Sequence, residues 1–188
     1  MKKEYLGIWV VLVVFIGALL WSERNPEIVP AKDELPIIKQ GEFVITSRVF
    51  GNEQTIPVLY TCDGAKVSPP LTIVSPPPDT KSFVLIVTDP DAPTGTFTHW
   101  TLWNIDSGVT EILEGNVPSK TVEGLTSAGK SGYVAPCPPS GTHRYFFELF
   151  ALDSVLGLNG QAKRSDLESA MQGHVIAKMT LIGRYNRP

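Results

Sequence analysis

Five ionisable side chains lie where apolar, strand-like segments begin or end: Asp89, Asp91, His99, His143 and Tyr145. The two aspartates are two positions apart, as are His143 and Tyr145, so each pair faces one side of an extended backbone. Imidazole and phenol groups can donate hydrogen bonds to an anion. The aspartates could orient the imidazoles, share a proton or accept a ligand ammonium group. The set indicates a small pocket for an anionic group.

The same residues also have purely structural explanations. A histidine that opens a strand is more often a hydrogen-bonding residue of the fold, and aspartates in a turn accept backbone N–H groups. Arg144 points opposite His143 in a regular strand and is expected to form a structural ion pair. Two of the three histidines nevertheless open apolar strands beside turn-rich loops, and this joint occurrence favours a shared site.

Enzymatic chemistry is less favoured. Two aspartates and two histidines could ligate a divalent metal in a hydrolase, but their spacing matches no standard metal motif. The chain has no G-x-S-x-G nucleophile elbow. We therefore expect no catalytic residues, no metal and no cofactor.

The two cysteines, Cys62 and Cys137, form neither a C-x-x-C motif nor a zinc spacing. They could form a disulfide if the domain lies outside the cytoplasm. The alternative is two separate buried thiols that only pack.

The elements that must position these residues are mostly strands. The chain contains 16 glycines and 16 prolines, which indicates many turns between short strands. A helix is predicted after the capping-box pattern Ser165-Asp166-Leu167-Glu168. Strands or β-prone segments are predicted over residues 41–49, 56–60, 71–74, 83–88, 99–105, 143–152 and 175–182. This pattern is typical of a mainly β domain with one or two late helices.

Three segments are predicted along the chain. Residues 1–22 form a membrane anchor or uncleaved signal sequence, in which the apolar run 5–21 follows Lys2 and Lys3. A helix over that run would span about 25 Å, short but acceptable for a bilayer. Residues 23–39 are an extended linker, and residues 40–188 form the folded domain. The lysines favour a cytoplasmic N-terminus and an extracytoplasmic domain; the alternative is secretion after signal cleavage.

The charge of the chain limits the classes of partner. The formal net charge is −3, and no basic run occurs in the domain. Nucleic acid is therefore not an expected partner. An anionic ligand must be held by a local site rather than by the overall field.

Several motifs, in order, resemble those of the phosphatidylethanolamine-binding protein family, also called Raf kinase inhibitor-like proteins, and most of all its short prokaryotic branch. The resemblance covers about residues 40 to 186. The matching segments are Thr61-Cys62-Asp63-Gly64, Ser68-Pro69-Pro70-Leu71, Asp89-Pro90-Asp91-Ala92-Pro93, His99-Trp100, Cys137-Pro138-Pro139, His143-Arg144-Tyr145 and Gly173-His174.

The resemblance implies two antiparallel β-sheets with one or two small peripheral helices. It also implies a cavity that takes phosphate, acetate or a phosphoethanolamine head group. Its ligand-binding residues would be Asp89, Asp91, His99, Pro138, His143 and Tyr145. The rim would consist of Trp100, Val134, Ala135 and Pro136, with Val134-Ala135 in place of the glycines that relatives often carry.

Two functions are open as hypotheses. The first is a non-catalytic protein that binds a phospholipid head group or a phosphorylated ligand. Such a protein could also act as a regulator. The alternative is an extracytoplasmic protease inhibitor that acts through the pocket rim. The ligand, the partner protein and the oligomeric state are left open by the sequence.

Overall fold

The structure is a computed structural model, and it describes residues 41–187 of the 188-residue chain. The predicted anchor (1–22) and linker (23–39) lie outside the described residues. Within the described part, no helix combines the length and the apolar content needed to cross a bilayer.

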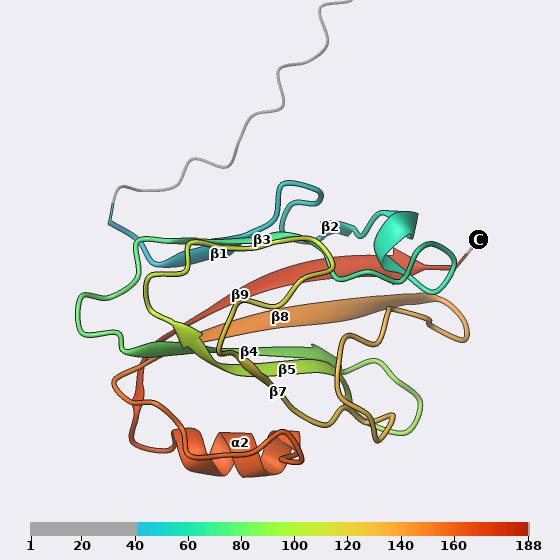
Figure 1. Cartoon of the computed structure of the whole chain (residues 1–188). Helices are drawn as coiled ribbons and strands as arrows, with labels where there is room; N and C mark the ends of the chain where they lie inside the picture. The colour runs from blue at the N-terminus through green and yellow to red at the C-terminus, as the bar shows by residue number, and fades with distance from the viewer. Residues whose placement is uncertain (1–40, 188) are drawn as a thin grey trace, which may run out of the picture. The chain divides into compact units, whose positions relative to one another are not determined.

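Two β-sheets make up most of the domain (Figure 1). The larger sheet has six strands in the order β2-β9-β8-β4-β5-β7, and the smaller has three in the order β1-β3-β6. The strands are β1 Val44–Thr46, β2 Gln54–Thr55, β3 Leu71–Val74, β4 Ser82–Asp89, β5 Phe97–Asp106, β6 Glu111–Ile112, β7 Val122–Glu123, β8 Thr142–Leu152 and β9 Val175–Asn186. The helical elements are the 3-10 turn η1 Val58–Tyr60 and the helix α2 Arg164–Met171. All strand pairs are antiparallel except β2–β9, which is parallel.

Strand β4 lies in the interior of the large sheet, between β5 and β8. All eight of its residues are buried, which agrees with its continuous apolar sequence. Because side chains alternate along a strand, Phe83, Leu85 and Val87 face one core, and Val84 and Ile86 face another.

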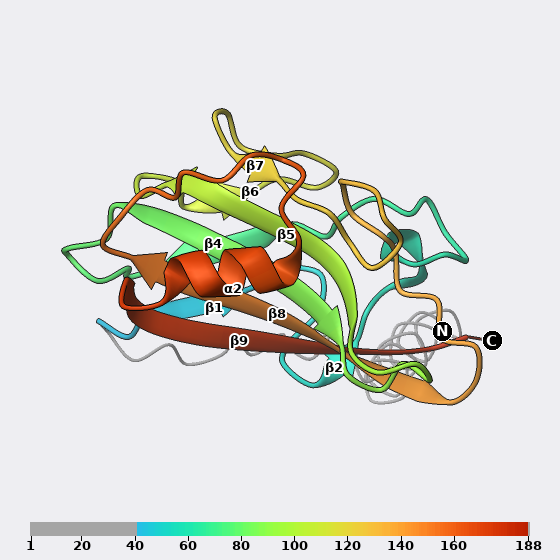
Figure 2. The same ribbon diagram turned by 90° about the horizontal axis from the view of Figure 1, so that it is seen from below.

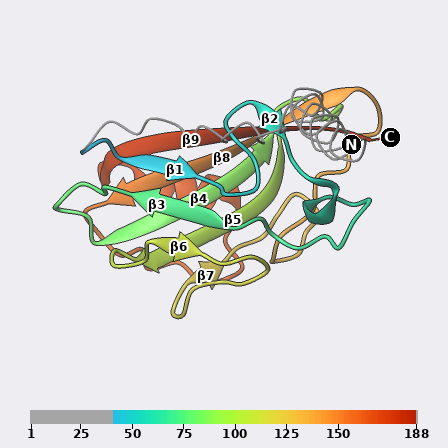
Figure 3. The same cartoon turned by 90° about the horizontal axis from the view of Figure 1, so that it is seen from above.

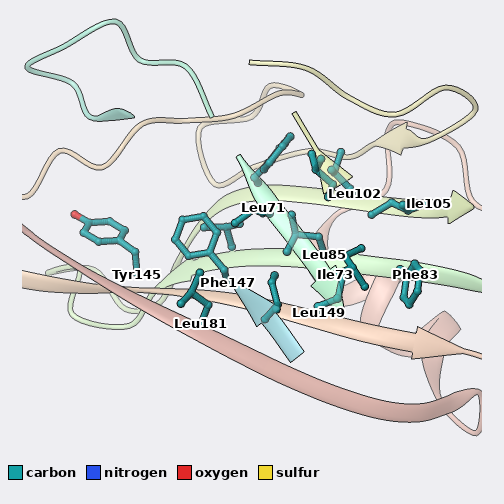
Figure 4. Close-up of a cluster of buried hydrophobic side chains, with 14 of the residues drawn as sticks. Leu71, Ile73, Phe83, Leu85, Leu102, Ile105, Tyr145, Phe147, Leu149 and Leu181 are labelled. Atoms are coloured by element: carbon teal, nitrogen blue, oxygen red, sulfur yellow. The ribbon is translucent and has the colours of Figure 1, made fainter. Parts of the chain in front are cut away.

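The first core lies between the two sheets. Figure 3 shows β1, β3 and β6 stacked over the large sheet. Leu71 and Ile73 of β3 meet the inward side chains of β4, β5 and β8, as the close-up in Figure 4 shows. This core fixes the positions of the central strands and therefore of the residues at their ends.

The second core lies on the opposite face of the large sheet, under α2. Figure 2 shows the helix crossing that face. Leu167 and Met171 of the helix pack against Val84, Ile86 and Trp103 of the sheet. Their spacing of four residues places both on one side of the helix.

Two local predictions were wrong. Residues 56–60 do not form a strand: Pro57 precedes the 3-10 turn η1, and the amide of Tyr60 donates back to the carbonyl of Pro57. The helix also begins before Ser165, because the Asp166 carboxylate accepts the backbone N–H of Lys163 at 2.9 Å. Glu168, the predicted second half of the capping box, instead pairs with Arg164 one turn earlier.

Candidate functional site

A small cavity lies where β4 ends and where β5 and β8 begin. The three strands are antiparallel neighbours, so Asp89 at the end of β4 pairs with Phe97 at the start of β5, and Thr88 pairs with Phe146 near the start of β8. The cavity has a volume of about 210 Å³. It is lined by Asp89, Ala92, Pro93, Thr94, Phe97, His99, Val134, Ala135, Cys137, Pro139 and His143.

Asp89 and His143 form a buried pair in the cavity wall. The distance from His143 Nδ1 to Asp89 Oδ2 is 2.7 Å, and the two residues are 7% and 4% exposed. The other carboxylate oxygen, Oδ1, accepts the backbone N–H of Asp91 at 2.8 Å. Asp89 therefore orients the imidazole and holds the turn that comes after β4.

His99 owes its orientation to an irregularity in β5. Val87 pairs with Trp100 and Thr88 with Thr98, so His99 is an extra residue in a β-bulge. A bulge redirects a side chain relative to regular alternation. The imidazole of His99 consequently lies against Tyr145, with ring centroids 5.2 Å apart, and lines the cavity.

The backbone of Val134 holds His99 at two points. Its carbonyl accepts a hydrogen bond from His99 Nδ1 at 2.6 Å, and its N–H donates to the carbonyl of His99 at 2.9 Å. Burial lowers the pKa of the His99 imidazole below its usual value, against smaller upward contributions from the Val134 hydrogen bond and Asp89. His99 is therefore neutral at pH 7.

The two imidazoles are fixed in the same tautomer. A carbonyl and a carboxylate both accept, so each Nδ1 carries a proton that it donates. Among residues 41–187, the Nε2 atoms of His99 and His143 have no hydrogen-bond partner. Each histidine thus offers one free ring nitrogen to a ligand.

Asp91 has a different role from Asp89. Its carboxylate accepts three hydrogen bonds from Arg144: from the backbone N–H and Nε at 2.9 Å each, and from Nη2 at 2.6 Å. These bonds lower the pKa of Asp91 to about 2. Asp91 does not line the cavity. The expected ion pair of Arg144 is present, and it joins the turn after β4 to the start of β8.

Tyr145 is fully buried, and its hydroxyl proton has no acceptor within the described structure. Burial raises the pKa of this phenol, and the charge of Asp89 raises it further, so the hydroxyl keeps its proton. The backbone N–H of Cys137 is near enough to the oxygen to oppose slightly this rise in the pKa. In Figure 4, Tyr145 lies at one end of the inter-sheet core with its hydroxyl pointing away from the cluster. An unpaired buried hydroxyl costs about 1–3 kcal/mol. Tyr145, a predicted ligand-binding residue, does not line the cavity but packs against His99, which does.

The predicted rim divides into residues on the cavity wall and residues behind it. Val134 and Ala135 line the cavity, together with Pro139 rather than the predicted Pro138. Pro136 does not line it, and its carbonyl accepts the N–H of Cys62 at 3.0 Å. The predicted Pro138, like Pro136, is buried.

Trp100 is also behind the cavity rather than on its rim. It is 1% exposed and belongs to the core between the sheets. Its Nε1 donates to Glu123 of β7 at 2.8 Å, and its ring meets Tyr133 edge-on. It supports the loop that carries Val134.

A disulfide joins Cys62 to Cys137, with the Cα atoms 5.3 Å apart. Cys137 lines the cavity and is exposed. The bond ties the rim loop to the segment after η1, where the Tyr133 hydroxyl also donates to the carbonyl of Tyr60 at 3.1 Å. The rim loop is therefore fixed by the disulfide and the Tyr133 hydrogen bond, in addition to the hydrogen bonds between Val134 and His99.

Sequence patterns did not single out Phe97 or Thr94, and they noted Ala92 and Pro93 only as part of the segment 89–93, not as site residues; all four line the cavity. Phe97 lies 4.8 Å from His99 between ring centroids. Its register opposite Asp89 could have been inferred only with the strand pairing in hand. Within residues 41–187, no group of three or more His, Cys, Asp or Glu side chains is arranged to hold a metal ion.

Comparisons with known proteins agree with this architecture. Residues 46–186 match the family model described as phosphatidylethanolamine-binding protein. A UPF0098 protein of Pyrococcus horikoshii is 48% identical in an alignment 150 residues long that covers 75% of this chain and 75% of its own. A UPF0098 protein of Methanothermobacter thermautotrophicus is 45% identical over 76% of this chain and 98% of its own.

Two solved structures share the fold. A phosphatidylethanolamine-binding protein homologue of Chlamydia trachomatis, CT736, superposes with a TM-score of 0.76 at 39% identity, over 79% of this chain and 99% of its own. YbcL of Escherichia coli, described as a new member of the mammalian phosphatidylethanolamine-binding protein family, superposes with a TM-score of 0.73 at 28% identity. The match covers 78% of this chain and 99% of YbcL. The chain belongs to the phosphatidylethanolamine-binding protein family.

Proposed function

We propose that this protein is a non-catalytic binding protein whose cavity holds a small phosphate-type group. The observation that carries the proposal is the pair of imidazoles with their Nδ1 atoms bound and their Nε2 atoms free. Both side chains line a cavity of about 210 Å³. Pockets that hold drug-sized ligands have volumes of about 300–1,000 Å³, so this cavity suits a head group rather than a whole large ligand.

The acidic residues do not oppose an anion here. The Asp91 carboxylate is bound by the guanidinium of Arg144, and Asp89 is bound by His143 and a backbone N–H. Asp89 lines the cavity, but its two oxygens, like those of Asp91, are already engaged in hydrogen bonds.

The residues that hold the imidazoles are themselves fixed. Val134 clamps His99 through two hydrogen bonds, and the disulfide of Cys137 limits movement of the same loop. A site whose hydrogen-bonding groups are oriented before binding loses little entropy when the ligand arrives. This arrangement supports tight binding of a small group without a closing lid.

The test is calorimetric titration of the full chain with phosphate and with phosphoethanolamine. We expect binding by the wild type and loss of at least tenfold in affinity in a His99→Ala, His143→Ala variant. His174→Ala is the matched control, because His174 also pairs with an aspartate, Asp153 at 2.8 Å, but on an exposed surface. The control should bind as the wild type does.

A folded wild type that binds neither ligand would overturn the proposal. The protease-inhibitor hypothesis would then be the next to examine, with a panel of extracytoplasmic proteases. Recovery of phosphoethanolamine unchanged after long incubation would support a binding role rather than a hydrolytic one.

A further inference from the structure

The cavity has more hydrogen-bond acceptors than an anion site should have. Because each Nδ1 proton is committed, a neutral imidazole presents only a lone pair at Nε2. A fully deprotonated oxyanion also has only lone pairs, so it cannot bond to a neutral Nε2. At each imidazole, the ligand or the nitrogen must supply a proton.

The two histidines differ in the group that accepts the hydrogen bond from Nδ1. His143 donates to the carboxylate of Asp89. His99 instead donates to the neutral carbonyl of Val134 and is 5% exposed, and burial lowers its pKa.

The other titratable groups facing His99 do not reverse this difference. They are Asp89 of β4, and His143 and Tyr145 of β8. Asp89 favours a charged His99, but its carboxylate is already bound by His143, and a charged His143 disfavours a second charge nearby. His99 therefore remains the acceptor of the pair.

Resting on the proposed function, we propose that the cavity selects phosphomonoesters over phosphodiesters, because His99 Nε2 accepts a hydrogen bond from a P–O–H group of the ligand. A phosphomonoester has a second pKa near 6 and can carry that proton near neutral pH. A phosphodiester has no such group and can bind only after His99 itself is protonated. The predicted ligand class is a phosphorylated small molecule or side chain, and an intact phospholipid is disfavoured.

Ethyl phosphate and dimethyl phosphate test this directly. The two are isomers, so they match in atom count, and at pH 5.0 each carries about one negative charge. They then differ chiefly in the P–O–H group. With the full chain at pH 5.0, we expect ethyl phosphate to bind at least tenfold more tightly than dimethyl phosphate.

A His99→Asn variant supplies the second readout. Its side-chain amide can still donate to the Val134 carbonyl, but it offers no acceptor where Nε2 lies. We expect the preference for ethyl phosphate to shrink to within about threefold in this variant and to persist in the His174→Ala control.

Each outcome decides something different. Equal binding of the two isomers by the wild type would overturn the monoester selection and leave the phosphate site standing. Retention of the full preference in His99→Asn would show that His99 is not the selecting residue and would overturn the inference as well. Failure of both isomers, phosphate and phosphoethanolamine to bind a protein with native near-ultraviolet dichroism would overturn the proposed function itself.

Discussion

The polar residues of the site are bound to one another before any ligand arrives. Asp89 orients His143, the Val134 backbone orients His99, and Arg144 occupies Asp91. The two Nε2 atoms have no hydrogen-bond partner among the described residues. Such a division between positioning groups and free groups is what a preorganised site requires.

The unpaired hydroxyl of Tyr145 predicts that its removal changes stability more than binding. Tyr145→Phe removes a buried group without a partner, so the free energy of unfolding should rise by about 1 kcal/mol. Affinity for phosphate should stay within about threefold of the wild type, because Tyr145 is fully buried and does not line the cavity. Urea denaturation and calorimetric titration measure the two effects.

Tyr185→Phe is the matched control for that substitution. Tyr185 is likewise buried, at 2% exposed, but its hydroxyl donates to Asp63 at 2.8 Å. Its loss should lower the free energy of unfolding by about 1 kcal/mol. If Tyr145→Phe destabilised the protein as much as Tyr185→Phe, the Tyr145 hydroxyl would have a partner in the free protein.

The ion pair of Asp91 and Arg144 predicts a loss of stability in acid. The pKa of Asp91 is lowered to about 2, mainly by hydrogen bonds from Arg144. A carboxyl whose folded pKa lies below its unfolded value of about 3.9 stabilises the fold above that pH and loses the effect as the pH falls towards 2. Because the pair is partly exposed, we expect it to contribute about 1–2 kcal/mol to the free energy of unfolding at neutral pH.

The measurement is the difference in unfolding free energy between the wild type and Asp91→Asn at several pH values. The difference should be largest above pH 5 and shrink between pH 4 and pH 2. Asp79→Asn, which changes an exposed carboxylate without an ion pair in the described part of the chain, should show no such difference. A wild-type advantage of constant size down to pH 2 would rule out this role for the pair.

The residue types predicted which side chains lie at the cavity better than they predicted what each side chain contacts. Asp89, His99 and His143 were selected from the sequence and line one cavity, although their binding of a ligand stays a prediction. The matching parity of Asp89 and Asp91 suggested a shared orientation, but the chain turns after Asp89, and Asp91 faces Arg144 instead. Parity holds only while the backbone stays extended.

At the scale of elements, the antiparallel order of the large sheet assembles the site. The end of β4 must lie beside the starts of β5 and β8, which brings together side chains more than 50 positions apart. The long apolar strands could be predicted because their patterns are strong. The bulge at His99 could not, since it depends on how β4 and β5 pair, and residues 56–60 were assigned wrongly because Pro57 starts a turn within a β-prone segment.

The disulfide between the rim loop and the segment after η1 predicts a link between redox state and the cavity. Cys62 and Cys137 are 75 positions apart, so breaking the bond should lower the free energy of unfolding by about 2–4 kcal/mol. Affinity for phosphate should fall several-fold, because Cys137 lies on the wall and the same loop holds His99 through Val134.

Thermal denaturation and titration of a Cys62→Ser, Cys137→Ser variant, beside reduced and alkylated wild type, measure both effects. The two forms lack the same bond and should agree. Unchanged affinity in the double variant would show that the hydrogen bonds of Val134 and Pro136 suffice to hold the rim.

At the scale of the whole described domain, the two cores lie on opposite faces of one sheet, and only one of them adjoins the cavity. The inter-sheet core ends at Tyr145 and fixes the wall of the cavity, while the core under α2 contributes no cavity residue. The general architecture was predictable from strand patterns and motif resemblance. The split into a six-stranded and a three-stranded sheet, with one parallel edge pair, was not, because sheet order depends on long-range pairing.

The disulfide and the N-terminal apolar run together predict where the domain resides. Disulfides persist in oxidising compartments and are rare in a reducing cytoplasm. Lys2 and Lys3 precede the apolar run 5–21. They favour an N-terminus that stays in the cytoplasm and export of the rest of the chain. In a bacterial host with a reducing cytoplasm, we therefore expect the full chain in the membrane fraction, with Cys62 and Cys137 inaccessible to a thiol reagent until reduction.

A chain that lacks residues 1–22 is the matched control for that experiment. It should stay in the cytoplasm, and its two cysteines should react with the reagent without prior reduction. Protease added to intact spheroplasts should digest the domain of the full chain and spare that of the truncated one. Protection of both would place the domain on the cytoplasmic side, whereas a shortened mature chain released from the cells would indicate a cleaved signal sequence instead of an anchor.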